Sequence, residues 1–461
     1  MAEYQKIDEI PYDFVRKRLS IVVASKQNPS ALMISKGSLE NILNACDKVL
    51  LGEQTELLTE KNTQNILQQY EDWSKEGYRV LGIAQKSFEP GKTYSRDDEQ
   101  AMVFVGFLLF FDPPKEGVGK TLNEMYRLGV QLKIITGDNK HVAQHVAQDV
   151  GIKTERIITG AELDVMKDEA LWHLAPKVNL FAEVDPNQKE RIISALQRTG
   201  HVVGYLGDGI NDAPALHAAD VGISVDQAVD VAKEAADFVL LKQNLNAVCK
   251  GIHEGRHTFA NTLKYIFITT SANFGNMISM AFASLFLPFL PMLAKQILLN
   301  NFLSDIPSMG IAGDNIDQNW DKTPHRWDMG LVRNFMIVFG IISVVFDLMT
   351  FGMLWYMGGM ASEIFRTGWF VESLLTEILI IFVIRSYKPF YLSRPSQFLI
   401  WSAVIMILIT LALPYLGIGK IFGFVPLPPS ILAAILGITI LYILVSEWTK
   451  RLFFHRIGMA E

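Results

Sequence analysis

Long runs without charge dominate the second half of this chain, and they constrain its fold more than any other feature. Residues 265–294 form the first run and contain no Asp, Glu, Lys or Arg. A helix needs about 20 apolar residues to cross a bilayer, so this run fits one membrane span and a turn into the next. The Pro-containing stretch 287–291 supplies that turn. An ordinary soluble fold is therefore disfavoured for this half.

Comparable runs continue toward the C-terminus, whereas the chain up to about residue 258 reads as a mixed globular sequence. Six spans are expected, an even number that places both ends of this half on one side of the membrane. Two loops rich in Lys and Arg, 385–394 and 450–456, are expected on the cytoplasmic side. The soluble half would then be cytoplasmic too. The expected spans begin and end near 265–287, 294–313, 335–356, 369–384, 398–415 and 430–445.

The composition narrows the possible partners. The formal net charge is −6 and no basic tract stands out, so nucleic acid is not expected as a partner. The two cysteines, Cys46 and Cys249, are too few for a disulfide framework or a metal cluster and fit a reducing cytosol. Residues 1–6 have no apolar core, so we expect no secretory signal there.

Polar residues within the expected spans indicate a cation site. Asn273 and Asn276 are three residues apart and share a helical face, as do Asn301 and Asp305, four apart. Pro307 frees a backbone carbonyl, which at membrane depth must face protein or a polar cavity. With Ser304, these groups would line an oxygen site for a hard cation; hydrogen bonding between helices explains the amides equally well. Three further acids each stand alone and are interpreted as packing or secondary-pathway residues: Asp347, Glu372 and Glu377.

The first half alternates apolar strands with helices, which predicts a parallel, doubly wound α/β sheet. The expected strands are 103–112, 131–135, 178–182 and 201–206. Ligands bind beyond the carboxyl ends of such strands. Those ends carry the polar residues Asp112, Thr136, Asp138 and Asp208.

These residue types suit phosphoryl transfer. Clustered carboxylates hold Mg²⁺ through hard oxygen ligands, and glycines let backbone N–H groups approach a phosphoryl oxygen. Thr136 adds a hydroxyl donor, and Lys189 would neutralise developing phosphate charge. Asp residues that cap helix N-termini explain Asp138 alone about as well. They do not explain the ordered combination with Lys189 and the Gly-Asp-Gly-Ile-Asn-Asp sequence at 207–212.

These motifs resemble the second half of the phosphorylation domain of P-type cation ATPases. The residues that carry the likeness are Asp112-Pro113-Pro114, Thr136-Gly137-Asp138, Lys189 and the sequence Gly-Asp-Gly-Ile-Asn-Asp-Ala-Pro-Ala-Leu at 207–216. Residues 259–276 are similar to the stalk and fifth span of the magnesium-transporting branch, as is Leu-Pro-Phe-Leu-Pro-Met at 287–292. The resemblance covers essentially the whole chain. It implies an α/β haloacid-dehalogenase-like doubly wound domain with an α+β nucleotide-binding remnant, followed by an all-α six-helix transmembrane bundle.

The resemblance also implies site residues. ATP would contact Phe14, Arg16, Lys36, Gly37 and Arg79. The catalytic Mg²⁺ would bind Asp208, with Asp212 also placed at the metal. Asn211, like Asp212, would support the phosphoryl site beside Thr136, Gly137, Asp138 and Lys189. The transported ion would be lined by Asn273, Asn276, Asn301, Ser304 and Asp305. Asn276 stands where calcium pumps carry a Glu, and fewer carboxylates suit Mg²⁺, which keeps part of its water shell.

By this resemblance the chain contains a partial nucleotide-binding domain (1–102), a phosphorylation domain without its phosphorylated-Asp strand (103–245), and a stalk with six spans (246–461). The implied function is ATP-driven transport of a divalent cation, Mg²⁺ import across the plasma membrane through an aspartyl-phosphate cycle. A pump for Ca²⁺ or H⁺ and a non-catalytic pseudo-pump remain as alternatives. So does a phosphatase of the same superfamily with a membrane anchor, which is disfavoured.

Two family motifs are absent from the sequence, namely Asp-Lys-Thr-Gly-Thr with the phosphorylated Asp, and Thr-Gly-Glu-Ser. Asp321-Lys322-Thr323 lacks the Gly and follows Asp208 in the chain, so it is a false match. We therefore expect the chain to be the C-terminal part of a pump, inactive without a partner half.

Overall fold

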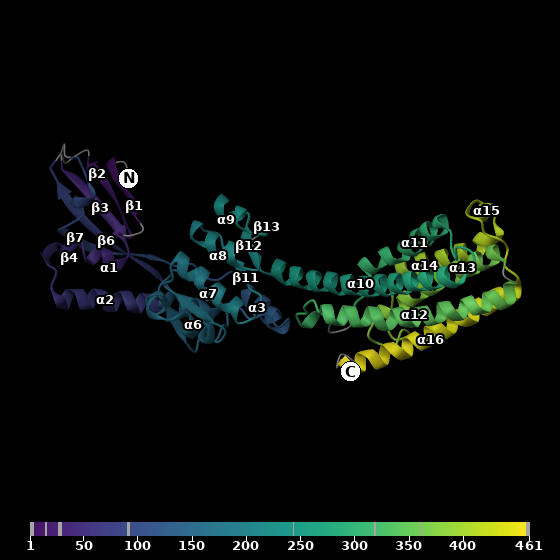
Figure 1. The fold of residues 1–461 in the computed structure, drawn as a ribbon. Coiled ribbons are helices and arrows are strands. Elements are labelled where there is room, and N and C mark those ends of the chain that lie inside the picture. Colours follow the sequence, from purple (N-terminus) through teal and green to yellow (C-terminus); the bar gives the residue numbers. More distant parts are fainter. Residues whose placement is uncertain are drawn as a thin grey trace. The chain divides into compact units, whose positions relative to one another are not determined.

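The computed structural model describes residues 4–13, 16–25, 30–89, 93–242, 244–317, 320–359 and 361–457. The chain divides into two compact units, Met1–Ala247 and Val248–Glu461. The first unit contains all the described strands and the second is helical; Figure 1 labels many of their elements.

A seven-stranded mixed sheet begins the first unit, in the order β1-β2-β3-β6-β7-β4-β5. Adjacent strands are antiparallel except β4 and β7, which are parallel. Alternate residues of β3 are buried, as the two-residue period of a strand requires when helices cover one face of a sheet. Ile42 of α1 and Ile66 of α2 lie in the core of this sheet. The bounds are β1 (Tyr4–Asp13), β2 (Arg18–Ser25), β3 (Ala31–Gly37), α1 (Leu39–Leu43), β4 (Cys46–Leu51), β5 (Gln54–Leu57), α2 (Glu60–Lys75), β6 (Arg79–Phe88), η1 (Arg96–Asp98) and β7 (Met102–Phe110).

One predicted strand lies in a different sheet from the one expected. The run at 103–112 corresponds to β7, which pairs antiparallel with β6 and parallel with β4. The prediction that it belongs to the parallel phosphorylation-domain sheet was therefore wrong, and Asp112 follows a strand of the first sheet. An apolar run indicates that a strand is buried, but it carries no information about which sheet the strand joins. The mixed sheet confirms the expected α+β region before the parallel strands.

The remainder of the first unit contains two parallel three-stranded sheets, β8-β10-β9 and β11-β12-β13. Helix α7 joins their cores, because its Ile192 packs in one and its Ile193 in the other. Asp185 caps this helix in a capping box with Gln188. The bounds are α3 (Val118–Arg127), β8 (Ile134–Ile135), α4 (Lys140–Asp149), β9 (Ile157–Thr159), α5 (Gly160–Val165), α6 (Asp168–Leu174), β10 (Leu180–Ala182), α7 (Pro186–Arg198), β11 (Gly204–Leu206), η2 (Ile210–Asp212), α8 (Ala213–Ala218), β12 (Val221–Val225), α9 (Asp230–Glu234) and β13 (Phe238–Leu240).

Strands β8 and β11 each leave one edge without a strand partner among the described residues. Ile135 of β8 packs against the cores of both sheets, so the two open edges border the same interior. Beside and within β11, Val202 and Leu206 are 70% and 43% exposed. Strands at the centre of a doubly wound sheet are normally buried on both faces. The parallel sheet is thus interrupted between β8 and β11.

In its described residues, the second unit is a bundle of six long helices with short helical segments between them. The polar contacts of their loops show that successive helices run between two ends of the bundle. At one end Asn261 donates to the carbonyls of Ala312 and Asp314, and Lys450 donates to the carbonyl of Lys388. The bounds are α10 (Asn246–Phe286), α11 (Ala294–Met309), η3 (Gly310–Gly313), η4 (Trp320–Lys322), α12 (Met329–Gly358), α13 (Ser362–Ile384), α14 (Gln397–Ala412), η5 (Leu413–Tyr415), α15 (Gly419–Phe422) and α16 (Pro429–Ile457).

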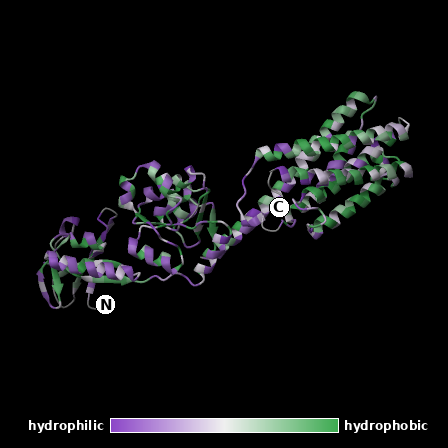
Figure 2. Ribbon diagram, turned by 90° about the horizontal axis from the view of Figure 1, so that it is seen from below, coloured by the Kyte–Doolittle hydropathy of each residue, from purple (hydrophilic) through white to green (hydrophobic). Residues whose placement is uncertain are grey.

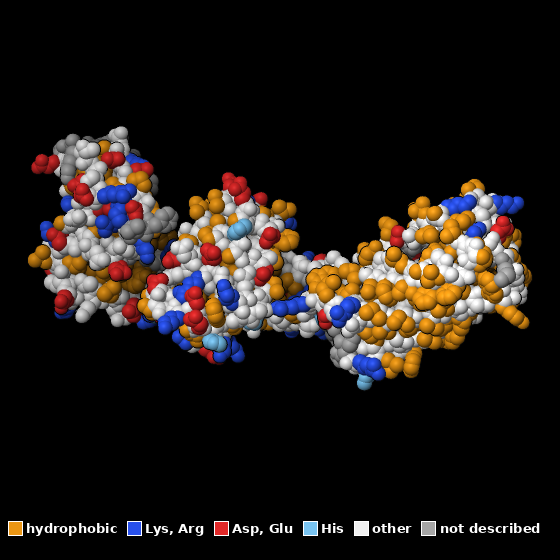
Figure 3. Space-filling view, viewed as in Figure 1, with side chains coloured by type: hydrophobic (Ala, Val, Ile, Leu, Met, Phe, Trp, Pro, Cys, Tyr) orange, Lys and Arg blue, Asp and Glu red, His pale blue; other side chains and the backbone are white. Residues whose placement is uncertain are grey.

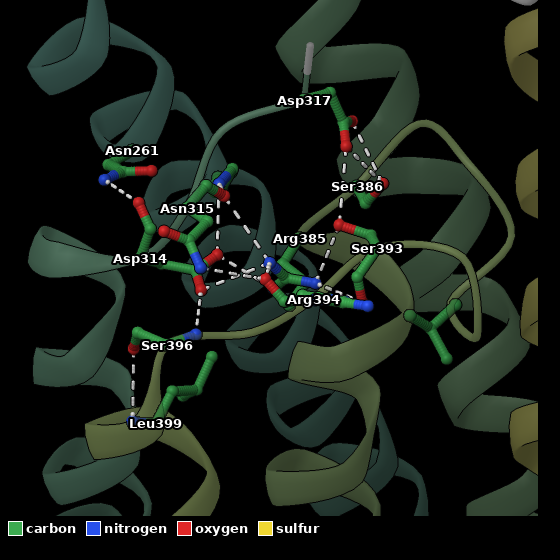
Figure 4. A network of polar contacts seen from close by, with 12 residues as sticks. Asn261, Asp314, Asn315, Asp317, Arg385, Ser386, Ser393, Arg394, Ser396 and Leu399 are labelled. Carbon is green, nitrogen blue, oxygen red and sulfur yellow. Dashed lines mark hydrogen bonds and ion pairs between the residues drawn. The ribbon is translucent and has the colours of Figure 1, made fainter.

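At the other end Gln296 donates to the carbonyl of Phe422, and the backbone N–H of Val425 donates to Thr367. Helices α10, α11, α12, α13, α14 and α16 therefore alternate in direction, which confirms the expected six-helix bundle. The loops 314–317 and 385–396 lie together at the first end. They meet in a network around Asp314 and Arg385, both fully buried (Figure 4).

Four of these helices are long and apolar enough to cross a membrane. They are α12, α13, α14 with η5, and α16. Helix α10 is long enough, with 41 residues, but its polar residues lower its hydropathy. Helix α11 is too short, with 16 residues. Figure 2 shows that hydrophobic residues are concentrated in this unit, and in Figure 3 they cover most of its visible face. The second unit is that of a multi-pass membrane protein.

Candidate functional site

The loop that follows β8 holds the first predicted motif. Thr136 accepts a hydrogen bond from the backbone N–H of Asp138 at 3.1 Å, and its hydroxyl donates to the Asp138 carboxylate at 3.1 Å. This local pairing fixes the loop at the open edge of β8. The guanidinium of Arg79, at the start of β6, lies 3.6 Å from the same carboxylate. Both side chains of that pair are largely exposed, so the ion pair is weak.

The loop that follows β11 is organised around Asp212. Its Oδ1 accepts from Lys189 Nζ at 2.7 Å and from the Tyr205 hydroxyl at 2.8 Å. Its Oδ2 accepts from the backbone N–H groups of Asp208 and Gly209 at 3.2 and 3.1 Å. Burial raises the pKa of Asp212, but the hydrogen bonds from Lys189, Tyr205 and Gly209 outweigh it and hold the pKa below its ordinary value. Asp212 is therefore an ionised carboxylate that positions Lys189 and the loop.

Tyr205 was not predicted as part of this site. It is the buried middle residue of β11, two residues before Gly207 of the Gly-Asp-Gly sequence. The two-residue period of a strand is the only signal in the sequence that its side chain points inward. Burial and the charge of Asp212 raise its pKa, so the hydroxyl remains a donor to that carboxylate.

Asp208 and Asn211 differ from Asp212 in being exposed. No hydrogen bond to the Asp208 carboxylate is recorded among the described residues, so its oxygens are open to a ligand. Gly207 is required here, because a Cβ on it would lie 2.5 Å from that of Asp212. Within the described part of the chain, no group of three or more His, Cys, Asp or Glu side chains forms a metal cage. This donor set fits Mg²⁺, which usually binds one or two carboxylates and keeps several waters.

The residues expected at the nucleotide lie at one end of the seven-stranded sheet. Gly37 pairs with Arg18 of β2 and with Gly82 of β6, and Arg79 begins β6. A Cβ on Gly37 would lie 2.4 Å from the carbonyl oxygen of Lys17, so the strands approach too closely for any side chain. Lys36 and Arg79 are exposed at this end. Phe14 lies outside the described residues.

Arg16, expected near the phosphates, is held by a buried acid. Its guanidinium pairs with Glu99, which is fully buried. Glu99 also accepts from Arg18 Nε at 3.0 Å and from the Ser20 hydroxyl at 2.6 Å. Burial alone would raise the pKa of Glu99, but the hydrogen bonds from Ser20, Arg16 and Arg18 lower it below its ordinary value. This cluster was missed because Glu99 lies about 80 residues from its partners in the chain.

In the bundle, Glu377 of α13 is the centre of a polar group. Its Oε1 accepts from Asn276 Nδ2 at 2.6 Å, and its Oε2 accepts from Asn300 Nδ2 at 3.0 Å. The interpretation of Glu377 as an acid that stands alone was therefore wrong. A small cavity beside it, able to hold about one water molecule, is also lined by Ser271, Ser343, Thr376 and Tyr442.

The other residues expected at the transported ion lie differently. Asn273, Asn301 and Asp305 are exposed, whereas Ser304 is half-buried and its hydroxyl donates to the carbonyl of Asn301 at 3.2 Å. Of the expected set, the described residues thus bring Asn276 to Glu377, and the structure adds Asn300 and Glu377 itself. Helical spacing within α10 and α11 does not reveal Glu377, because that side chain comes from a third helix.

Known families match separate parts of this chain. Residues 1–117 match the cytoplasmic domain N of P-type ATPases, 187–252 match haloacid dehalogenase-like hydrolases, and 289–452 match the C-terminus of cation transporting ATPases. In that order they agree with the mixed sheet, the parallel α/β region and the helical bundle. The chain belongs to the P-type cation-transporting ATPases.

Among curated relatives, the similarity extends to magnesium-transporting members. Magnesium-transporting ATPase, P-type 1, of Escherichia coli (strain K12) is 40% identical over 464 residues, which cover 99% of this chain and 51% of the relative. Its Salmonella typhimurium (strain LT2) counterpart is 38% identical over 465 residues, with the same coverage. Calcium-transporting ATPase 1 of Bacillus cereus is 31% identical over 369 residues, 79% of this chain and 41% of the relative. The chain spans about half the length of the curated relatives it matches.

Proposed function

We propose that this chain is part of an ATP-driven pump for a divalent cation, and that phosphoryl transfer takes place at the open edges of β8 and β11. The observation that carries the proposal is the group around Asp212. It holds Lys189 in a buried ion pair and fixes the backbone of Asp208, whose own carboxylate stays exposed. A phosphoryl group in transfer requires a fixed positive charge, here the Lys189 ammonium, and its metal requires an accessible carboxylate, here that of Asp208.

ATP and Mg²⁺ are the proposed cofactors. Lys36, Gly37 and Arg79 would bind the nucleotide at the end of the mixed sheet, with Phe14 and Arg16 as further contacts. Asp208 would be the direct ligand of Mg²⁺, because both oxygens of Asp212 already accept hydrogen bonds. The metal would neutralise charge on the phosphate oxygens. Thr136, Gly137, Asp138 and Asn211 would contribute donors and position the loops.

The phosphoryl acceptor in this proposal is an Asp on a strand that fills the interruption between β8 and β11. Within the described residues both strands have one edge without a strand partner, and apolar side chains beside and within β11 are exposed, as a missing central strand would leave them. The γ-phosphoryl group would move from ATP to the carboxylate of that Asp, and ADP would leave. The sequence contains no Asp-Lys-Thr-Gly-Thr motif, so the acceptor would come from a segment outside this sequence. The chain alone would then be inactive.

Mg²⁺ is the proposed cargo, and import into the cytoplasm is the proposed direction. Support comes from the names of the relatives and from the group at Glu377, in which one carboxylate is accompanied by the side-chain amides of Asn276 and Asn300. Such a set suits an ion that keeps part of its water shell. Asn273, Asn301 and Asp305 would complete the site on their exposed side. In the same proposal the plasma membrane holds the bundle, with both termini and the first unit in the cytoplasm.

The test fuses the preceding half of the E. coli relative to this chain, so that assembly of two pieces is not in question. Purified fusion protein is incubated with ATP labelled on its γ-phosphate, and acid-stable, hydroxylamine-sensitive label on the protein is measured. We expect label that disappears in Lys189→Met and Asp208→Asn. Asp230→Asn, an exposed acid in a surface pair with Lys233, is the matched control and retains label.

Uptake of isotopic Mg²⁺ into cells that lack their own magnesium transporters tests cargo and direction. Uptake above that of the Lys189→Met fusion supports import. A fusion protein that is folded and binds nucleotide but incorporates no phosphate label from ATP contradicts phosphoryl transfer and favours the non-catalytic alternative. A phosphoenzyme that forms only with Ca²⁺ contradicts the choice of Mg²⁺ while leaving the pump intact.

A further inference from the structure

Glu99 connects the segment before β7 to the segment that joins β1 to β2. Its side chain is fully buried. Its Oε2 accepts hydrogen bonds from the guanidinium of Arg16 and from Nε of Arg18, the latter at 3.0 Å. Its Oε1 accepts from the Ser20 hydroxyl of β2 at 2.6 Å. One carboxylate oxygen thus holds the two arginines, while the other is anchored in the sheet.

The two arginines differ in how many of their donors the protein uses. Arg18 also donates to the carbonyls of Asn41 and Glu99, at 3.0 and 3.3 Å. Among the described residues, the hydrogen bonds of Arg16 go to Glu99 and to the carbonyl of Pro11, the latter at 3.2 Å. A guanidinium has five N–H donors, and the Arg16 side chain is 16% exposed. Arg16 therefore retains both unused donors and access to solvent.

The ion pairs around Arg16 contain more positive than negative charge. Asp13 Oδ2 lies 3.6 Å from Arg16 Nε and 3.5 Å from Arg96 Nη1. Within the described part of the chain, these contacts and those of Glu99 bring three guanidinium groups to two carboxylates. The excess of positive charge favours a bound anion. A phosphate group suits this position, because it accepts charge-assisted hydrogen bonds from a guanidinium.

Arg16 lies at the end of the mixed sheet where the nucleotide is proposed to bind. Arg18, the first residue of β2, pairs with Gly37, the last residue of β3. The backbone N–H of Ser38 donates to the carbonyl of Lys17 at 3.1 Å. The segment that carries Arg16 is therefore hydrogen-bonded to the end of β3, directly after Lys36.

Compared with apolar residues of similar volume, a buried ion pair adds little net stability, so stability alone does not account for Glu99. We propose that Glu99 is a positioning residue of the nucleotide site, which holds the guanidinium of Arg16 so that its unused donors can bind a phosphate of ATP. Glu99 does not touch the nucleotide itself, because its side chain is fully buried. The inference rests on the nucleotide site proposed above and adds a residue that was not in that set.

The experiment is isothermal titration calorimetry on the purified full chain in lipid nanodiscs, with ATP and with adenosine, which has no phosphate. We expect Arg16→Gln and Glu99→Gln each to raise the Kd for ATP about 10-fold or more, as the loss of a hydrogen bond to a charged group does. The Kd for adenosine should stay unchanged. The double variant should bind ATP no more weakly than Arg16→Gln alone, because Glu99 acts only through Arg16.

Three further variants separate positioning from support of the fold. Ser20→Ala removes the hydrogen bond to Oε1 and leaves Oε2 with the arginines, so it should lower stability without changing either Kd. Glu71→Gln, an exposed acid paired with Lys75 on α2 at 3.5 Å, is the matched control. Glu99→Asp keeps the charge but withdraws the carboxylate from Arg16, so it should lose ATP affinity selectively even if Glu99→Gln does not fold.

The outcomes distinguish this inference from the proposed function. A folded Glu99→Gln that binds ATP as tightly as the wild type would overturn the inference and leave the nucleotide site standing. Equal weakening for ATP and adenosine would also overturn it, because Glu99 would then only support the fold. So would additive losses in the double variant. A wild-type chain that binds no ATP would contradict the nucleotide site itself, and this inference with it.

Discussion

The pair of Lys189 and Asp212 allows a quantitative test of how the loop after β11 is held. In Asp212→Ala, the Lys189 ammonium and the Tyr205 hydroxyl would lose their shared acceptor. The side chains of the ion pair are 11% and 12% exposed, so solvent screens the interaction little. Removing one partner of a buried ion pair costs about 3–5 kcal/mol. At about 1.4 kcal/mol per factor of ten, a loss of about 3 kcal/mol would speed local opening roughly 100-fold.

Hydrogen exchange measured by mass spectrometry on the full chain reads this opening directly. The backbone N–H groups of Asp208 and Gly209 donate to Asp212, so they report the loss of the carboxylate. We expect amides of 207–212 to exchange roughly 100-fold faster or more in Asp212→Ala, and by a smaller factor in Asp212→Asn, which keeps an accepting oxygen.

The control is Asp230→Ala, whose surface pair with Lys233 spans 3.0 Å while the Asp230 side chain is 92% exposed. Such pairs contribute about 0–1 kcal/mol, so exchange should change no more than a few-fold. Less than a tenfold change in Asp212→Ala, or an equal change in the control, would refute the assignment of Asp212 as the group that holds this loop.

Three further predictions concern other parts of the chain. Glu99 has a lowered pKa in the folded state, so its ionised form stabilises the fold above its unfolded pKa of about 4.3, and that stability is lost as the pH falls through the folded value. Hydrogen exchange of β2 should therefore show a defect in Glu99→Gln that stays constant from pH 7 down to about pH 5 and narrows below about pH 4. Gly37→Ala should destabilise the mixed sheet by about 1–3 kcal/mol, because the new Cβ meets backbone; faster exchange of β2 and β3 would confirm it. Arg385→Met should lower the melting temperature of the bundle only in part, because Lys264 Nζ also lies 3.1 Å from the Asp314 carboxylate. Arg385→Met with Lys264→Met removes both cations from the buried Asp314, so it should lower the melting temperature further, at a cost of about 3–5 kcal/mol.

The sequence was sufficient to predict elements and motifs, since these depend on residues near one another in the chain. Apolar runs predicted the helices of the bundle. The predicted strands 131–135 and 201–206 were also correct in that Thr136 and Asp208 lie in loops that follow parallel strands. Strand β7 was assigned to the wrong sheet because hydrophobicity is the same whichever neighbour a strand joins. Its pairing with β6 depends on register across a loop, which no local pattern encodes.

Side-chain partners distant in the sequence were not predictable. Glu377 meets Asn276 and Asn300 across 101 and 77 residues, so its role depends on how three helices are rotated about their axes. Spacing within one helix shows which residues share a face, but not which face meets another helix. Arg16 illustrates the reverse case, because its expected ligand is outside the chain and the structure gives it an internal partner, Glu99.

The network around Asp314 has a mechanical consequence for α10. Asn261, on that helix, donates to the Asp314 carbonyl at 2.9 Å, while the Asp314 carboxylate accepts from Arg385 and from the backbone of Ser396 (Figure 4). A helix advances about 1.5 Å per residue, so sliding α10 by one residue along its axis would break the short Asn261 contact. Axial motion of α10 must therefore carry the loops 314–317 and 385–396 with it. The two loops and the segment of α10 around Asn261 would then move together as one rigid body. Bending of α10 would occur outside this segment.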